Sequence, residues 1–87
     1  MSWWVYMIEA DDGSLYTGVT TDIARRFREH QGAGRGARYF KGRRPLAVVY
    51  LESQPDRSAA QRREAAIRKL KRSDKLNLKQ NVMIFHD

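Results

Sequence analysis

The pattern of apolar and polar positions predicts two neighbouring strands at the start of the chain. Residues 3–10 (WWVYMIEA) are rich in aromatic and branched side chains, which favour extended structure. The sequence DDGS at 11–14 predicts a turn, in which Gly13 can adopt a positive φ. Residues 15–20 (LYTGVT) predict the returning strand, so the first twenty residues are expected to form a β-hairpin.

A helical pattern follows the hairpin. Thr21 or Asp22 can cap this helix, because either side chain can accept a hydrogen bond from a free backbone N–H group. Ile23 and Phe27 are four residues apart and form an apolar stripe. Gly32 is the predicted end of the helix.

A loop rich in glycine and arginine is predicted at residues 32–45, before a clearly apolar strand at 46–53. We call it the basic loop, and its five basic residues are Arg35, Arg38, Lys41, Arg43 and Arg44. These cations are the candidate contacts to a nucleic-acid backbone, which would make binding sensitive to salt and largely independent of sequence.

A second helix is predicted at residues 58–72, where Ser58 and Gln61 form a capping box. Its buried side is expected to consist of Ala60, Ile67 and Leu70. Ser73 is the predicted cap of a further short helix. The order strand, strand, helix, strand, helix, helix indicates an α+β fold, with a small antiparallel three-stranded sheet flanked by helices.

The length of 87 residues predicts one domain over residues 1–87. There is no cysteine, which excludes disulfides and thiolate metal sites and fits a cytoplasmic location. No apolar run approaches the roughly 20 residues that span a bilayer, so no membrane partner is expected.

The formal net charge of +7 changes the expectation about partners. Such a balance predicts a polyanion, of which nucleic acid is the commonest. Two alternatives remain at this point: the charges only keep the protein soluble, or they bind an acidic protein.

Glu64 is the first candidate functional residue, because it falls between Ala60 and Ile67 on the side predicted to be buried. A buried carboxylate needs a cation, a hydrogen-bonding network or a metal. One interpretation is an ion pair with an arginine of the same helix or with Arg26 across the fold. The other is a ligand for a hard divalent cation such as Mg²⁺.

Arg26 and His30 lie four residues apart on the first predicted helix. Arg26 is either one of several solvated arginines or a planar fork that holds a scissile phosphate. Tyr6 and Tyr16 are strand residues that either pack in the core or act as general bases. His30 could take a proton near neutral pH or simply donate a hydrogen bond. Gly18 indicates a place where a backbone or ligand approaches closely.

Together these residues resemble the GIY-YIG endonuclease superfamily. VYM at 5–7 and YTG at 16–18, followed by Arg26 and Glu64, are similar to the motifs of that family. The resemblance is closest to its small stand-alone bacterial members, the YhbQ-like group, and covers the chain from Trp4 to about Leu76.

The resemblance implies a single-metal site that hydrolyses a DNA phosphodiester. In the family the tyrosines position or activate the water, the arginine contacts the phosphate and the glutamate holds the metal. A histidine frequently follows the arginine by one turn. The matching positions in this sequence are Tyr6, Tyr16, Gly18, Arg26, His30 and Glu64.

The sequence departs from the family pattern at three positions of the two tripeptides. Trp4 replaces a glycine, and Val5 and Thr17 each replace an isoleucine. We expect a Mg²⁺- or Mn²⁺-dependent nuclease that acts on DNA, with branched or single-stranded forms among the candidates, in repair or recombination, as a monomer or weak dimer. The alternative is a module of the same fold that binds nucleic acid and cuts slowly or not at all.

Overall fold

The computed structural model of the protein describes residues 2–32 and 36–79. Its elements are β1 (Trp3–Ala10), β2 (Leu15–Thr20), α1 (Ile23–His30), the 3-10 helix η1 (Arg38–Phe40), β3 (Pro45–Gln54), α2 (Arg57–Arg68) and α3 (Arg72–Leu78). The predicted α+β order is confirmed. In the order of elements the structure adds η1, a single turn of 3-10 helix within the basic loop.

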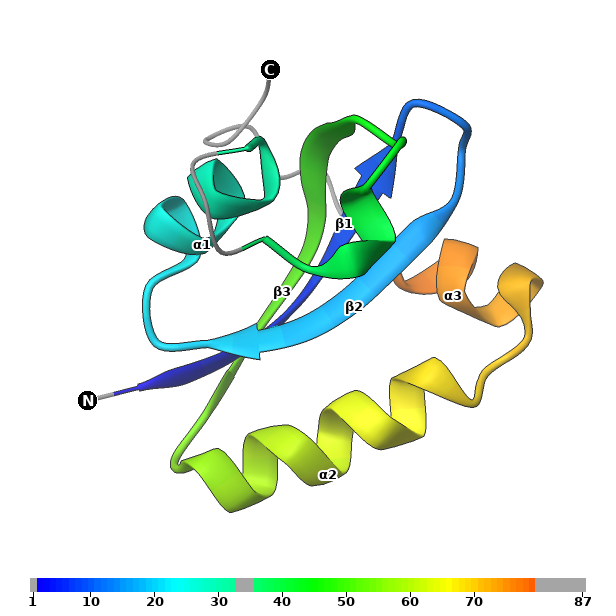
Figure 1. Ribbon diagram of the computed structural model, residues 1–87. Coiled ribbons are helices and arrows are strands. Elements are labelled where there is room, and N and C mark those ends of the chain that lie inside the picture. The colour runs from blue at the N-terminus through cyan, green and yellow to red at the C-terminus, as the bar shows by residue number, and fades with distance from the viewer. Residues whose placement is uncertain (1, 33–35, 80–87) are drawn as a thin grey trace.

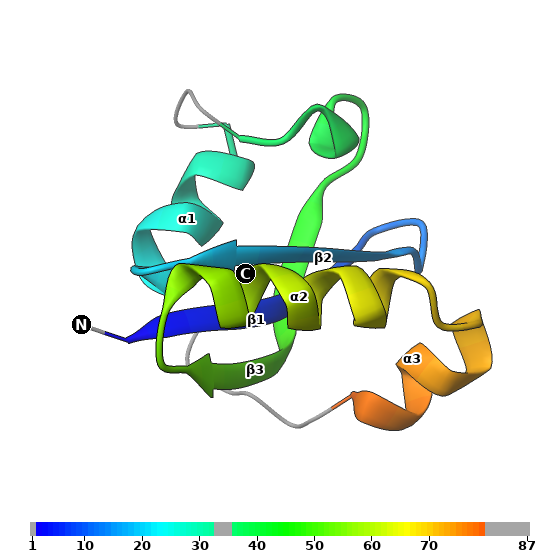
Figure 2. The ribbon, with the colours of Figure 1, turned by 90° about the horizontal axis from the view of Figure 1, so that it is seen from below.

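β1 lies in the middle of the antiparallel sheet, with β2 and β3 on its two sides. α1 and α2 cover opposite faces of this sheet (Figure 1). Viewed from below, α1 and η1 lie towards one side of the molecule and α3 towards the other (Figure 2). β2 forms one edge of the sheet, and helices from both sides of the sheet lie next to it.

Side chains of β1 alternate between two cores, as the period of two of a strand requires. The cluster on the α2 face consists of Val5, Met7, Ala47, Val49, Tyr50, Ala60 and Ile67. The cluster on the α1 face consists of Tyr6, Ile8, Ala10, Phe27, Phe40 and Val48. The second strand follows the same rule, since Tyr16 packs on the α1 face while Leu15 and Val19 pack on the α2 face.

Turn and cap residues fix the ends of the elements near the hairpin. Gly13 has a φ of 82°, as the predicted turn requires. Asp22, rather than Thr21, caps α1, since its carboxylate accepts a hydrogen bond from the backbone N–H of Arg25 at 3.1 Å. Gly32 follows the end of α1 with a φ of 112°, which an L side chain rarely adopts.

The predicted capping box of the second long helix is wrong. Asp56 caps α2 instead, because its carboxylate accepts from the backbone N–H of Ala59 at 2.8 Å. A carboxylate at this end also interacts favourably with the helix dipole, so the helix begins earlier than predicted. Ser58 lies inside the helix, where its hydroxyl accepts from the guanidinium of Arg62.

Two predictions at the end of this region are also wrong. Leu70 is 37% exposed, because α2 ends at Arg68 and the helical spacing no longer aligns Leu70 with Ile67. Ser73 does not cap α3, which begins at Arg72 without a side-chain hydrogen bond at its cap. Within the ranges that the structure describes, no helix is long and apolar enough to cross a membrane.

Candidate active site

The hairpin places Tyr6 directly opposite Gly18 in the pairing of β1 with β2. A Cβ atom on Gly18 would lie 2.5 Å from the Tyr6 hydroxyl oxygen and 2.6 Å from the ring carbon that bears it. Real Cβ atoms do not approach so closely, so any larger residue would displace the phenol. The close approach predicted at Gly18 is therefore that of Tyr6.

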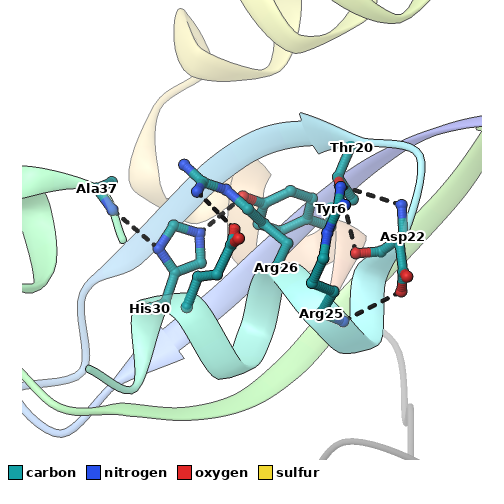
Figure 3. A network of polar contacts seen from close by, with 8 residues as sticks. Tyr6, Thr20, Asp22, Arg25, Arg26, His30 and Ala37 are labelled. Carbon is teal, nitrogen blue, oxygen red and sulfur yellow. Dashed lines mark hydrogen bonds and ion pairs between the residues drawn. The ribbon is translucent and has the colours of Figure 1, made fainter. Parts of the chain in front are cut away.

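Tyr6 is hydrogen-bonded to His30 of α1 in the α1-side core (Figure 3). The Tyr6 oxygen lies 2.8 Å from Nε2 of His30, and Nδ1 of the same ring accepts the backbone N–H of Ala37 at 3.1 Å. A neutral imidazole that accepts at Nδ1 carries its proton on Nε2, so His30 donates and Tyr6 accepts. His30 thus connects Tyr6 of β1 with Ala37, the residue that precedes η1.

Burial lowers the pKa of His30 from its ordinary 6.5 to about 4, and the charge of Arg26 acts in the same direction. The side chain is only 4% exposed. His30 is therefore neutral at physiological pH and has both ring nitrogens engaged. This geometry favours a residue that positions Tyr6 over one that exchanges a proton itself.

The low pKa of His30 makes the fold sensitive to acid. Because the unfolded chain binds this proton at 6.5 and the folded chain only at about 4, the unfolded state holds more protons between these values. The free energy of unfolding should therefore fall as the pH decreases through this range, by about 3 kcal/mol from this group. Urea unfolding at several pH values measures this decrease in the free energy of unfolding.

His30→Gln is the matched variant for this measurement, because it cannot titrate. We expect it to be less stable than the parent near neutral pH and to lose less stability on acidification. Carboxylates that titrate in the same range contribute equally to both proteins. Parallel pH dependences for parent and variant would contradict the neutral, buried state of His30.

Arg26 lies beside Tyr6 on α1. Its guanidinium forms an ion pair with Glu29 at 3.0 Å. Burial raises the pKa of Tyr6 far above its ordinary value of 10.0, helped by the nearby Tyr16 and only partly opposed by Arg26. Tyr6 is thus a fully buried, protonated phenol whose oxygen accepts a hydrogen bond from His30.

Tyr16 extends this cluster to the outer edge of β2. Its ring centroid lies 5.2 Å from that of His30 and 6.2 Å from that of Tyr6. The Tyr16 ring centroid also lies 5.2 Å from the ring centroids of Tyr39 and Phe40 in η1. Tyr16 is only partly buried, so its aromatic contacts leave part of the side chain accessible.

Tyr16 also lines a groove of about 270 Å³ at the edge of β2. The lining residues of this edge groove are Leu15, Tyr16, Thr17, Tyr39, Glu64, Arg68 and Lys75. The groove therefore joins residues of β2, η1, α2 and α3. It unites Tyr16 with the candidate metal ligand Glu64, which comes from the opposite helical layer.

Glu64 is half-buried, as its position between Ala60 and Ile67 predicts. Its carboxylate lies 3.5 Å from the guanidinium of Arg68, with side-chain exposures of 20% and 66% respectively. An ion pair with such an exposed partner contributes little to stability. A divalent cation could therefore displace Arg68 at small cost.

The donor set of the edge groove fits a loosely held hard cation. Among residues 2–32 and 36–79, no three His, Cys, Asp or Glu side chains gather closely enough to hold a metal. Mg²⁺ commonly binds through one or two carboxylates, with waters and substrate phosphates completing its shell. Glu64 satisfies this requirement, whereas the described residues offer no site for a structural metal enclosed by protein ligands.

The basic loop is organised mainly around the hairpin turn. Arg43 pairs with Asp12 at 2.8 Å and stacks on Tyr39 at 4.4 Å from the ring centroid. The backbone N–H of Arg44 donates to the carboxylate of Asp11. These contacts hold the loop, and with it η1, beside the edge groove.

Two further cations of the basic loop lie beside another hollow. Arg38 and Lys41 line a second hollow of about 320 Å³, next to His30. Arg35 is outside the described residues. Binding of nucleic acid by the loop therefore stays a prediction.

Five residues of the edge groove were not among the candidates from the sequence. They are Leu15, Thr17, Tyr39, Arg68 and Lys75. Arg68 had a signal, since it follows Glu64 by one helical turn. Tyr39 was an aromatic residue among loop cations, and only the position of η1 brings it to Tyr16.

The comparison of sequences shows the family to which this fold belongs. The GIY-YIG catalytic domain matches residues 2–77. The chain therefore belongs to the GIY-YIG family, a nuclease superfamily whose members act on DNA. The predicted family is confirmed.

The similar proteins are of the UPF0213 group. The UPF0213 protein of Desulfotalea psychrophila is 49% identical over 77 residues, which cover 88% of this chain and 70% of that protein. The UPF0213 protein YhbQ of Salmonella arizonae is 42% identical over 76 residues, covering 87% and 75%. The solution NMR structure of the UPF0213 protein BH0048 from Bacillus halodurans is 41% identical, with a TM-score of 0.56 over 90% of this chain and 82% of that one.

Proposed function

We propose that the protein is a divalent-metal-dependent endonuclease that hydrolyses DNA phosphodiester bonds. The observation that supports this most is the position of Tyr16. It contacts the rings of Tyr6 and His30 and also lines the groove that contains Glu64. A phosphate at the edge of β2 would thus contact a tyrosine and a carboxylate together, with Arg26 nearby on α1.

Glu64 would hold Mg²⁺ or Mn²⁺ in the edge groove. When bound, such an ion polarises a phosphoryl oxygen and makes water a better nucleophile. The carboxylate must first leave Arg68, which then faces the groove as a free cation. Arg68 and Lys75 would there offset the charge of the entering phosphate.

Arg26 would bind the scissile phosphate and offset the charge that develops in the transition state. Its partner Glu29 competes for the same guanidinium, so substrate binding requires that this ion pair open. The pair is partly exposed on both sides, which makes the exchange inexpensive.

Tyr16, as a phenolate, would accept the proton of the attacking water and become the neutral phenol, because it lines the groove. Tyr6 is unsuited to that step, since it is fully buried and its pKa is raised. Tyr6 and the neutral His30 would instead hold Arg26 and Tyr16 in place. The roles of the two tyrosines therefore differ.

The basic loop and the cations of the edge groove would contact DNA phosphates rather than bases. Such contacts suit selection by the shape of the DNA, as for branched or single-stranded forms in repair or recombination. Binding should then weaken steeply with salt.

Cleavage of end-labelled single-stranded, duplex and branched DNA tests the proposed function. We expect cleavage with Mg²⁺ or Mn²⁺ that stops when EDTA removes the metal and resumes when metal is returned. Binding of DNA should persist in EDTA, because the cations of the surface remain.

A module that binds but does not cut is the second candidate. The ion pairs of Arg26 with Glu29 and of Glu64 with Arg68 favour it, since both charged candidates already have partners. Salt-sensitive binding of all three DNA forms without metal-dependent products would establish this second function instead.

A further inference from the structure

Thr17 presents an anomaly in the core beside the edge groove. Its Oγ1 is the one buried side-chain oxygen or nitrogen among the described residues that has no hydrogen-bond partner. The side chain is only 6% exposed. An unpaired buried hydroxyl destabilises a fold relative to an apolar group of the same shape, so valine would suit this position better on packing alone.

Thr17 lies on the face of the sheet that is covered by α2, the helix of Glu64. It pairs with Met7 of β1, which belongs to the α2-side core. The alternation of β2 places Thr17 on the same face as Leu15 and Val19, and Tyr16 on the opposite face. Thr17 and Glu64 also line the same groove.

We propose that Thr17 is a positioning residue for Glu64, whose carboxylate accepts the Thr17 hydroxyl hydrogen when it binds a divalent cation. The proposal rests on the proposed metal site. In the structure Glu64 is paired with Arg68, and the Thr17 hydroxyl lacks a partner. If a cation displaces Arg68, one carboxylate oxygen of Glu64 would lack a hydrogen-bond donor. The hydroxyl of Thr17, which has no partner, can supply that donor.

Such a donor matters for affinity because hydrogen bonds to a ligand orient it and restrict its motion. Loss of a partner of this kind typically weakens metal binding about 10- to 100-fold. The hydroxyl would therefore destabilise the metal-free protein and strengthen the metal-bound form. These two opposite effects distinguish a positioning residue from an ordinary core residue.

Binding of Mn²⁺ to the protein without DNA tests the proposal, measured from the EPR signal of the free ion. Thr17→Val removes the hydroxyl and keeps the shape, and Thr17→Ser keeps the hydroxyl. We expect the valine variant to bind Mn²⁺ at least about tenfold more weakly, and the serine variant to bind nearly as the parent does. Urea unfolding without metal should find the valine variant no less stable than the parent. If that variant does not fold, Thr17→Ala replaces it in the same titration.

Thr20→Val is the matched control. Thr20 is also a buried threonine of β2, but its hydroxyl accepts the backbone N–H of Asp22 and donates to the carbonyl of the same residue. We expect this variant to lose stability and to keep the Mn²⁺ affinity of the parent. An equal loss of affinity in both valine variants would overturn the proposal, because it would reflect general loosening of β2.

Glu64→Gln, titrated in parallel, separates the two levels of inference. If it abolishes Mn²⁺ binding while Thr17→Val binds as the parent does, the role of Thr17 is refuted and the metal site stands. If the parent itself binds no Mn²⁺, or the glutamine variant binds it equally, the proposed metal site fails, and the role of Thr17 with it.

Discussion

Replacing Glu64 by glutamine is expected to lower metal-dependent DNA cleavage by roughly 10³-fold, because a bound metal contributes several kcal/mol to the transition state. The substitution keeps the shape of the side chain and removes the charge that holds the cation. Stability should change little, since the ion pair of Glu64 is with a largely exposed partner, Arg68. Single-turnover cleavage of labelled DNA at saturating Mg²⁺ measures the effect.

Glu52→Gln is the control for this variant. Glu52 is likewise a half-buried carboxylate paired with an arginine of α2, in this case Arg63 at 3.0 Å. It does not line the edge groove. We expect this variant to lose stability and to cleave at nearly the parental rate. If Glu64→Gln cleaves DNA at the parental rate, Glu64 has no role in catalysis and serves only as the ion-pair partner of Arg68.

Replacing Arg26 by alanine is expected to slow cleavage by about 10²- to 10³-fold, the usual effect of removing a donor that stabilises developing charge. Arg26→Lys should recover only part of this loss, because an ammonium group lacks the planar fork that binds phosphate at two points. Both variants should bind Mn²⁺ as the parent does, since Arg26 does not line the edge groove. Single-turnover rates and Mn²⁺ titration together check this prediction.

Arg25 provides the matched control on the same helix. It is exposed, one position away, and does not take part in the contacts of Tyr6. Arg25→Ala should weaken DNA binding modestly at low salt and leave the rate at saturating DNA close to that of the parent. If both alanine variants slow cleavage equally at saturation, the arginines of α1 act only through their general charge.

Much of the fold was predictable because local patterns determine it. The aromatic and branched residues of 3–10, the glycine turn after them and the pattern of 15–20 are enough to define the hairpin. The spacing of Glu64 between Ala60 and Ile67 correctly placed it towards the sheet. The caps were harder, since Asp56 and Ser58 are both good cap residues, and only the backbone geometry decides between them.

The contacts of the site were less accessible from the sequence. Family resemblance selects Tyr6 and His30, but their hydrogen bond, and the tautomer that Ala37 imposes, depend on how the following segment packs on α1. Gly36 allows that packing, because a Cβ there would lie 2.5 Å from the carbonyl oxygen of Glu29. Which tyrosine faces the groove likewise depends on burial, which the spacing of the two motifs does not reveal.

The placement of the edge groove between two helical layers has a mechanical consequence. Arg26 is attached to one layer and Glu64 to the other, and the three-stranded sheet is the rigid connection between them. A sliding of α2 along the sheet by about 1 Å would separate the two halves of the site without breaking either, and misplacement on that scale can cost about 10² in rate. The catalytic rate would then report how firmly α2 is seated on the sheet, even where global unfolding detects no change.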